Sequence, residues 1–169
     1  MINRIFCAVI ALFFSALCFS QNKDISFEMS NSFQVSKGFG EGNSGLCLVG
    51  FTMAPGIGFT DRWVLSLPVQ ANLYAKTTSP QSVSEDAMAG LSVTYKKGLV
   101  DYEASHLFGF YSSSVKQMES SFSLMFNRGE DDRSSFYKIG VSYLSPYDRN
   151  VKGMFCVSAG LGLRFSSRK

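Results

Sequence analysis

The segment CVSAGLGLRF, residues 156–165, places an apolar side chain at every second position. One side of an extended chain would carry Val157, Ala159, Leu161, Leu163 and Phe165, and the other would carry cysteine, serine, glycine and arginine. Successive side chains of a β-strand point to opposite faces of the sheet. The segment is therefore predicted to be a strand with one apolar face and one polar face. The orientation of those two faces relative to water then determines the architecture.

The same two-residue period recurs along the rest of the chain, and turns rich in glycine, serine or charged residues separate the segments that show it. The predicted strands are 25–35, 46–54, 63–73, 87–95, 100–110, 118–126, 137–143 and 156–165. Eight strands that each bury one face close into a barrel, because closure removes the unpaired edges. We therefore predict an all-β, eight-stranded antiparallel up-and-down barrel.

The N-terminal segment has the layout of a secretory signal peptide. Arg4 precedes an apolar run from Ile5 to Phe14, and small residues follow. The run is too short for a spanning helix, which needs about 20 apolar residues. We predict a signal peptide at residues 1–20 and a barrel domain at 21–169, with no helical membrane span in the mature chain.

Charge and cysteine content exclude several classes of site. The 16 basic and 13 acidic residues are scattered, so no basic stripe indicates nucleic acid. A single histidine, no close cysteine pair and an acidic trio in a turn at 130–132 indicate no metal site, and no cofactor is predicted. Cys47 and Cys156 fall on strands that a third strand separates, which argues against a disulfide.

The aromatic residues of the apolar faces indicate that these faces meet lipid. One predicted ring contains Phe27, Trp63, Tyr95, Tyr102, Phe126, Tyr137 and Phe165, and the other contains Phe33, Phe110, Tyr143 and Phe155. Two aromatic girdles around an aliphatic belt are typical of a barrel in a bilayer. A soluble lipocalin-like barrel would instead turn its apolar face inward.

The polar faces are then predicted to fill the lumen, where their charges must pair. We expect a structural network of Glu28, Asp101, Glu103, Lys138 and Arg164. Glu28 is expected to contact Arg164, because strands one and eight close the barrel, and Lys138 is expected to reach Asp101 or Glu103. His106 is the one irregularity, since its position in the alternation turns it toward lipid unless a bulge shifts the register.

The C-terminal segment carries a family resemblance. Ser158, Gly160, Leu163 and Phe165 match the terminal-strand signal of bacterial outer-membrane barrels. The whole mature chain resembles the small eight-stranded outer-membrane family, such as the transmembrane domain of outer-membrane protein A. That resemblance implies contact with outer-membrane lipid, recognition by the barrel-insertion machinery, and periplasmic termini. The segments 37–45, 76–86, 112–117 and 145–153 would then lie outside the cell.

An eight-stranded membrane barrel has just enough interior for its own side chains, so a conducting pore is not expected. Ser105 and His106 are neighbours on one strand and point to opposite faces, so they cannot act as a catalytic pair. We predict a non-enzymatic barrel with a structural or adhesion-like role through four loops of about six to eleven residues. The alternatives are a lipid-modifying outer-membrane enzyme and a soluble, ligand-carrying barrel.

Overall fold

The computed structural model describes residues 25–40, 46–76, 82–128 and 133–167. Its strands are β1 (Ser26–Phe39), β2 (Leu46–Gly58), β3 (Trp63–Ser66), β4 (Val69–Lys76), β5 (Ser82–Lys97), β6 (Val100–Ser112), β7 (Gln117–Arg128), β8 (Arg133–Pro146) and β9 (Met154–Ser166). The predicted signal peptide and the acidic trio lie outside the described residues. Within the described ranges, no helix combines the length and the hydropathy of a membrane span.

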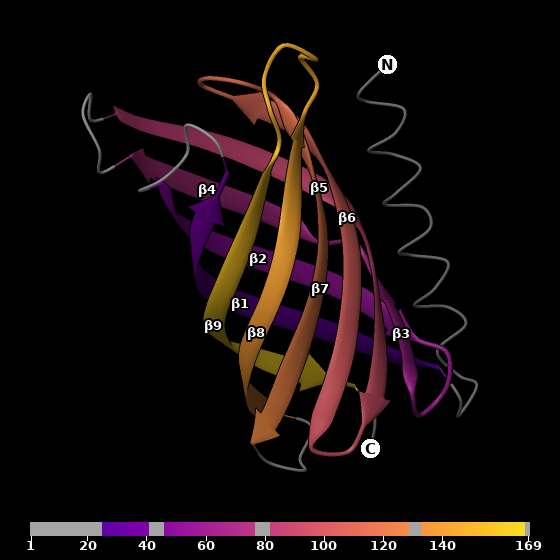
Figure 1. Cartoon of the computed structure of the whole chain (residues 1–169). Coiled ribbons are helices and arrows are strands. Elements are labelled where there is room, and N and C mark those ends of the chain that lie inside the picture. Colours follow the sequence, from indigo (N-terminus) through magenta and orange to yellow (C-terminus); the bar gives the residue numbers. More distant parts are fainter. Residues whose placement is uncertain (1–24, 41–45, 77–81, 129–132, 168–169) are drawn as a thin grey trace, which may run out of the picture.

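The strands form one closed antiparallel sheet, wrapped into a tilted cylinder (Figure 1). β1 pairs with β2 on one side and with β9 on the other, which closes the barrel between the first and the last strand. β3 and β4 both pair with β2 and with β5, so together they occupy one position in the wall. The predicted eight-stranded, up-and-down barrel is therefore confirmed.

The predicted third strand is interrupted at Leu67 and Pro68. Proline has no backbone N–H, so it cannot donate to the ladder at this position. The wall nevertheless stays bonded across the break. Leu67 N donates to Pro55 O at 2.8 Å, and Gly90 N donates to Pro68 O at 3.1 Å. Residues that face inward and outward keep alternating from β3 into β4, so the break does not change which face each residue occupies.

The strands extend beyond the segments in which apolar and polar residues alternate. β1 runs on to Phe39, which pairs with Phe155, and β5 already begins at Ser82, which pairs with Lys76. The predicted loop lengths were therefore wrong, because backbone pairing continues into glycine- and serine-rich segments. At the end of the barrel where β1 finishes, the links between strands are residues 40–45, 77–81, 113–116 and 147–153.

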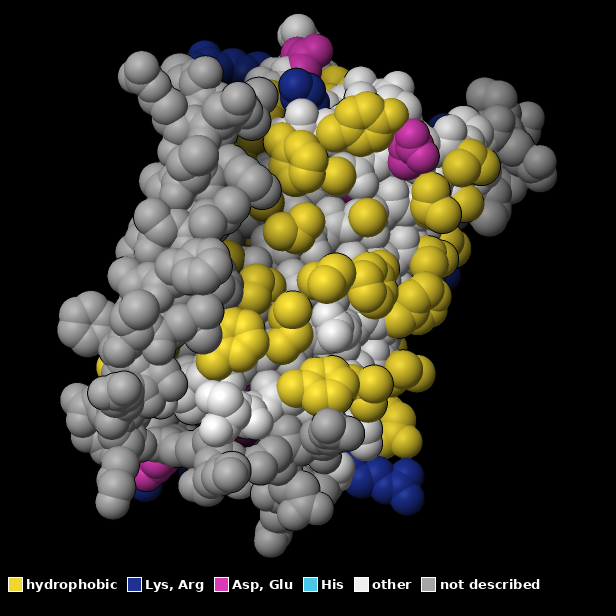
Figure 2. Space-filling model, turned by 180° about the vertical axis from the view of Figure 1, so that it is seen from behind, with side chains coloured by type: hydrophobic (Ala, Val, Ile, Leu, Met, Phe, Trp, Pro, Cys, Tyr) yellow, Lys and Arg dark blue, Asp and Glu magenta, His cyan; other side chains and the backbone are white. Residues whose placement is uncertain are grey.

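The apolar faces of the strands point outward. In β9, Leu161 and Leu163 are 60% and 53% exposed, whereas Cys156 and Arg164 are 1% and 9% exposed. Hydrophobic side chains are spread over the visible wall, and charged side chains appear at its two ends (Figure 2). The barrel is thus inverted relative to a soluble protein, with an apolar exterior and a polar interior.

Aromatic residues mark both ends of this exterior. All seven residues of the first predicted ring occupy outward positions of their strands, and the rings of Trp63 and Tyr95 pack at 4.8 Å. At the opposite end, Tyr143 packs on Phe155 at 4.8 Å. Phe33 does not belong to that second ring, because β1 continues for six residues beyond it and places it near the middle of the wall.

Candidate functional site

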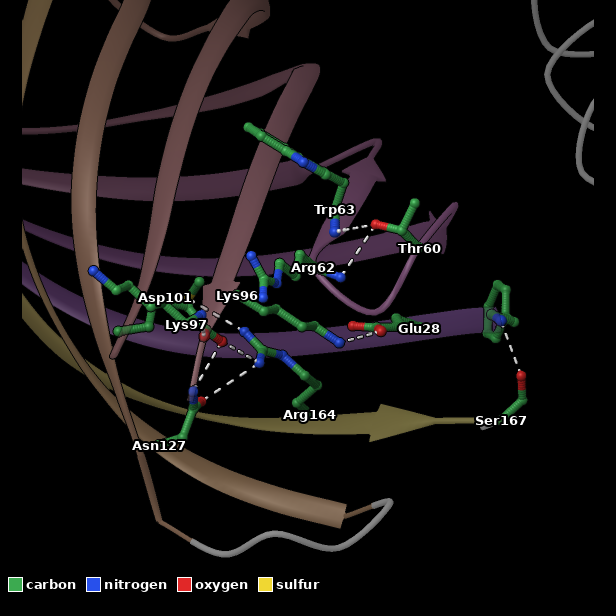
Figure 3. A network of polar contacts seen from close by, with 12 residues as sticks. Glu28, Thr60, Arg62, Trp63, Lys96, Lys97, Asp101, Asn127, Arg164 and Ser167 are labelled. Atoms are coloured by element: carbon green, nitrogen blue, oxygen red, sulfur yellow. Dashed lines mark hydrogen bonds and ion pairs between the residues drawn. The ribbon is translucent and has the colours of Figure 1, made fainter. Parts of the chain in front are cut away.

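A buried ion pair crosses the lumen near the end of the barrel where β1 begins and β9 ends (Figure 3); these two strand ends are the termini of the barrel. Arg164 Nη1 of β9 donates to Asp101 Oδ2 of β6 at 2.6 Å. Asn127 Nδ2 donates to the same oxygen at 2.8 Å, and Lys97 N donates to Asp101 Oδ1 at 3.1 Å. The guanidinium also lies 5.6 Å from the ring centre of Phe136. The carboxylate is therefore fully engaged by donors from three other points on the wall.

The predicted contact between Glu28 and Arg164 is wrong. The register places Arg164 opposite Ser30 and Glu28 opposite Ser166, and each charged side chain then reaches across the lumen. Glu28 pairs with Lys96 of β5 instead (Figure 3). Lys96 lies just beyond the predicted strand 87–95, so the sequence does not predict it as the partner of Glu28.

A third ion pair lies at mid-height. Lys138 of β8 donates to Glu103 of β6, so of the two acceptors considered from sequence it contacts Glu103. β7 lies between the two strands, so this pair joins strands that are not neighbours in the sheet. The hydroxyls of Ser105 and Ser121 lie 2.6 Å apart between β6 and β7.

The half of the lumen farther from the termini holds two carboxylates, Asp86 and Glu119, that are not part of the three ion pairs above. Asp86 accepts from Tyr74 Oη at 2.6 Å, from Asn72 Nδ2 at 3.0 Å and from Gln117 Nε2 at 3.0 Å. Glu119 accepts a hydrogen bond from Gln70 Nε2 at 3.0 Å. Asp86 and Gln117 fall in the predicted outer segments 76–86 and 112–117, so the sequence does not predict this network. Only the cross-strand register brings these side chains together.

An apolar layer lies inside the barrel toward the same end. It consists of Leu48, Tyr74, Met88, Leu107, Leu144, Met154 and Cys156, all buried. The interior is therefore filled by its own side chains at successive heights. Cys156 belongs to this layer, whereas Cys47 lies on an outward position of β2. Both thiols are free, and β1 separates their strands.

Comparison with known proteins supports this architecture. No family model and no curated protein matches the chain. Among solved structures, Neisserial surface protein A is similar over 83% of this chain and 96% of its own, with 10% identity and a TM-score of 0.54. The N-terminal β-barrel domain of Pseudomonas aeruginosa OprF covers 82% and 97%, with 12% identity and a TM-score of 0.46. Ail, the attachment invasion locus protein of Yersinia pestis, covers 85% and 99%, with 12% identity and a TM-score of 0.46.

The fold is that of the small outer-membrane β-barrels. In a barrel of this type, the exposed apolar wall described above is the surface that meets hydrocarbon. Trp63, Leu91 and Leu163 lie on that wall, as the predicted orientation requires.

A hydrogen-bonded polar pair lies on the apolar outer wall. His106 Nδ1 of β6 lies 2.8 Å from Ser120 Oγ of β7, and the imidazole packs edge-on against Phe108 at 4.6 Å. The ladder continues without a shift at His106, and the bulge falls between Ala87 and Met88 instead. The serine beside His106 is therefore not its sequence neighbour Ser105 but Ser120, which the register places opposite His106. Each polar group satisfies the other in an apolar setting.

The described residues bring no carboxylate to His106 to complete a triad. Ser120 also lies within ladders to β6 and β8, so the backbone N–H groups around it are committed to neighbouring strands. The same part of the chain contains no group of three or more histidine, cysteine, aspartate or glutamate side chains that could hold a metal ion.

The C-terminal motif has a packing role in this barrel. Ser158 and Gly160 face the lumen, whereas Leu163 and Phe165 face outward. A Cβ atom built on the neighbouring Gly162 would lie 2.3 Å from the Phe136 ring. Glycine at this position therefore leaves room for a large aromatic side chain inside the barrel.

Proposed function

We propose that the chain is a non-enzymatic protein of the bacterial outer membrane, with a structural or surface-interaction role. The observation that carries this proposal is the inverted barrel. Its outward face is apolar, and the charged side chains Asp101, Glu103 and Arg164 are held in pairs inside. A closed barrel satisfies every backbone group of its wall internally, which is what a bilayer demands.

The surface role would depend on the end opposite the termini. With periplasmic termini, the links at 40–45, 77–81, 113–116 and 147–153 face the outside. The lumen is filled, so transport through it is not the proposed activity. An adhesion-like contact through short connections on a rigid wall remains the function that this geometry supports best.

The proposal includes two partners. Outer-membrane lipid would cover the wall between the two aromatic ends. The barrel-insertion machinery would engage β9, whose Leu163 and Phe165 face outward next to β1. Substituting Phe165 by serine should lower the amount of folded protein in the membrane without changing its synthesis, whereas the same change at Phe155 should have a smaller effect.

Cell fractionation tests the compartment. The protein should enter the outer-membrane fraction, resist an alkaline wash, and migrate differently in boiled and unboiled samples on a denaturing gel. A thiol-reactive label on a cysteine introduced at Asn150, in the link between β8 and β9, should react on intact cells. Recovery in the soluble fraction, or protection of that cysteine in intact cells, would contradict the proposal.

The His106–Ser120 contact favours a second candidate function, a hydrolase acting on lipid acyl chains. A hydroxyl beside an imidazole is the minimal arrangement for nucleophilic catalysis. We place it second because the described residues supply neither an orienting acid nor oxyanion donors beside Ser120. Incubation of purified protein with phospholipid, with Ser120→Ala as the control, tests it. Fatty-acid release that the substitution abolishes would replace the primary proposal.

A further inference from the structure

An apolar groove of about 630 Å³ crosses the outer wall of the barrel over β7, β8, β9 and β1. These strands are consecutive neighbours in the sheet, and β7, β8 and β9 lie side by side in Figure 1. Outward-facing apolar side chains form most of the lining, namely Val35, Phe122, Leu124, Ile139, Val141 and Val157. Ala159 also lines the groove and has a shorter side chain than Val35 and Ile139, the residues paired with it on either side, so it lowers the wall between them.

The groove follows one row of directly paired residues around the barrel. The row leaves β1 at Lys37 and passes through Val157, Val141 and Phe122. Followed onward through β6, β5, β3 and β2, the row returns to β1 at Phe27, ten residues nearer the end that carries the termini. The tilt of the strands therefore lowers the row by about 3 Å at each strand. The groove thus begins near the opposite end of the barrel, at Lys37, and descends toward the middle of the wall.

The length of the groove matches the thickness of one lipid leaflet. From Lys37 to Leu124 the groove crosses three strand spacings and extends two residues along β7, which together make about 16 Å. The hydrocarbon core of a bilayer is about 30 Å thick, so each leaflet accounts for about 15 Å of it. One acyl chain that starts beside Lys37 would therefore lie in the groove over most of its length.

Lys37 gives the upper end of the groove a positive charge. Its side chain faces outward and lines the groove. The amine lies 5.9 Å from the ring centre of Phe39, which pairs with Phe155 among the aromatic residues at this end. Aromatic residues at the ends of a membrane barrel lie at the level of the lipid headgroups. No carboxylate among the described residues forms an ion pair with Lys37, so an anionic headgroup is favoured beside it.

We propose that the groove binds one anionic, phosphate-bearing lipid of the surrounding membrane. The phosphate lies at Lys37, and one acyl chain runs over Ala159 toward Leu124. The occupant is a lipid rather than a soluble anion, because the groove opens on the apolar exterior and its lining below Lys37 is almost entirely apolar. The inference rests on the proposed function, since the groove meets lipid only when the barrel is inserted in a membrane.

The test compares two tryptophan reporters in the full chain, inserted in phosphatidylcholine vesicles. Trp63→Phe removes the only native tryptophan, and Phe122→Trp then places a reporter in the groove. Leu91→Trp places the reporter on β5, outside the groove. Its depth is similar, because β5 is two strands further down the row and Leu91 lies two residues up from it. Quenching by phosphatidylglycerol or phosphatidylcholine brominated at mid-chain gives the relative binding constant of each lipid at the reporter.

Phosphatidylglycerol should bind about fivefold more tightly than phosphatidylcholine at the groove reporter, which is the effect of one lysine near an anionic headgroup. Lys37→Gln should abolish this preference. Lys116→Gln is the matched control and should retain it, because Lys116 is an exposed lysine at the same end that does not line the groove. Ala159→Phe fills the groove and should also abolish the preference, whereas Ala71→Phe, the same change at an outward position of β4, should not.

Several results would overturn the inference. An equal preference at Leu91→Trp would indicate a general attraction of anionic lipid to the barrel, and loss of the preference on adding glycerol phosphate to the water would indicate a simple anion site. A preference that survives Lys37→Gln would remove the headgroup contact, and one that survives Ala159→Phe would remove the acyl-chain contact. A protein that does not insert into vesicles contradicts the proposed function as well, whereas an inserted protein without the preference contradicts this inference alone.

Discussion

Replacing Asp101 by asparagine should destabilise the barrel by about 3 kcal/mol, because it leaves a buried guanidinium without its counter-charge. The Asp101 side chain is 1% exposed and accepts hydrogen bonds at both oxygens, from Arg164 and Asn127 at one and from Lys97 N at the other. An amide of the same shape has one acceptor only. Its NH₂ group would therefore face a donor, whichever way it is turned.

Unfolding in urea, with the protein in lipid vesicles, measures this change. The chain has a single tryptophan, and Trp63 lies on the apolar outer wall, so its fluorescence should report loss of the vesicle-inserted state. Glu85→Gln is the matched control, since Glu85 is an exposed carboxylate that accepts a bond from Tyr111. The control should unfold at the urea concentration of the unaltered protein.

A double substitution tests whether the charge pair is the cause. Arg164→Met removes the guanidinium and places an apolar side chain between Met125 and Phe136. The double variant with Asp101→Asn should be more stable than the sum of the two single losses predicts, by about 1 kcal/mol or more. Strict additivity, or an unchanged midpoint for Asp101→Asn, would refute the reasoning that the lumen depends on paired charges.

Three further outcomes are expected from the same geometry. Val141→Arg, at an outward position near the middle of β8, should cost about 2–4 kcal/mol in vesicles, whereas Val151→Arg in the β8–β9 link should cost little; equal effects would place the wall in water. Gly162→Ala should destabilise the barrel by about 1–3 kcal/mol through contact with Phe136, and Phe136→Leu should restore part of the loss. Planar-bilayer recordings should show no steady ion conductance, because side chains fill the lumen at each height; regular open-channel steps would contradict this.

The two-residue period of the sequence predicted the barrel because each wall position constrains only its own side chain. Each outward residue of β9, such as Leu161, needs only to be apolar, and that requirement is readable one residue at a time. The alternation ends where the strands leave the apolar belt, although their backbone pairing does not. Strand ends such as Phe39 and Ser82 were therefore placed too early or too late.

The partners inside the lumen could not be predicted in the same way. Asp101 and Arg164 are 63 residues apart, and their contact depends on the stagger of every strand between them. Glu28 was predicted as the partner of Arg164 because the two residues lie on neighbouring strands. Long side chains near the end of a barrel can, however, contact strands across the lumen as readily as adjacent strands. The His106–Ser120 pair was missed for a related reason, since register rather than sequence spacing places the two residues side by side.

The alternation that specifies this fold also limits where ligand chemistry can occur. Each residue in the middle of a strand is committed either to lipid or to a filled interior, and a polar group on the outside needs a partner there, as His106 finds in Ser120. Toward the end of the barrel opposite the start of β1, Lys76 and the serines near it line a cavity instead of a packed lumen.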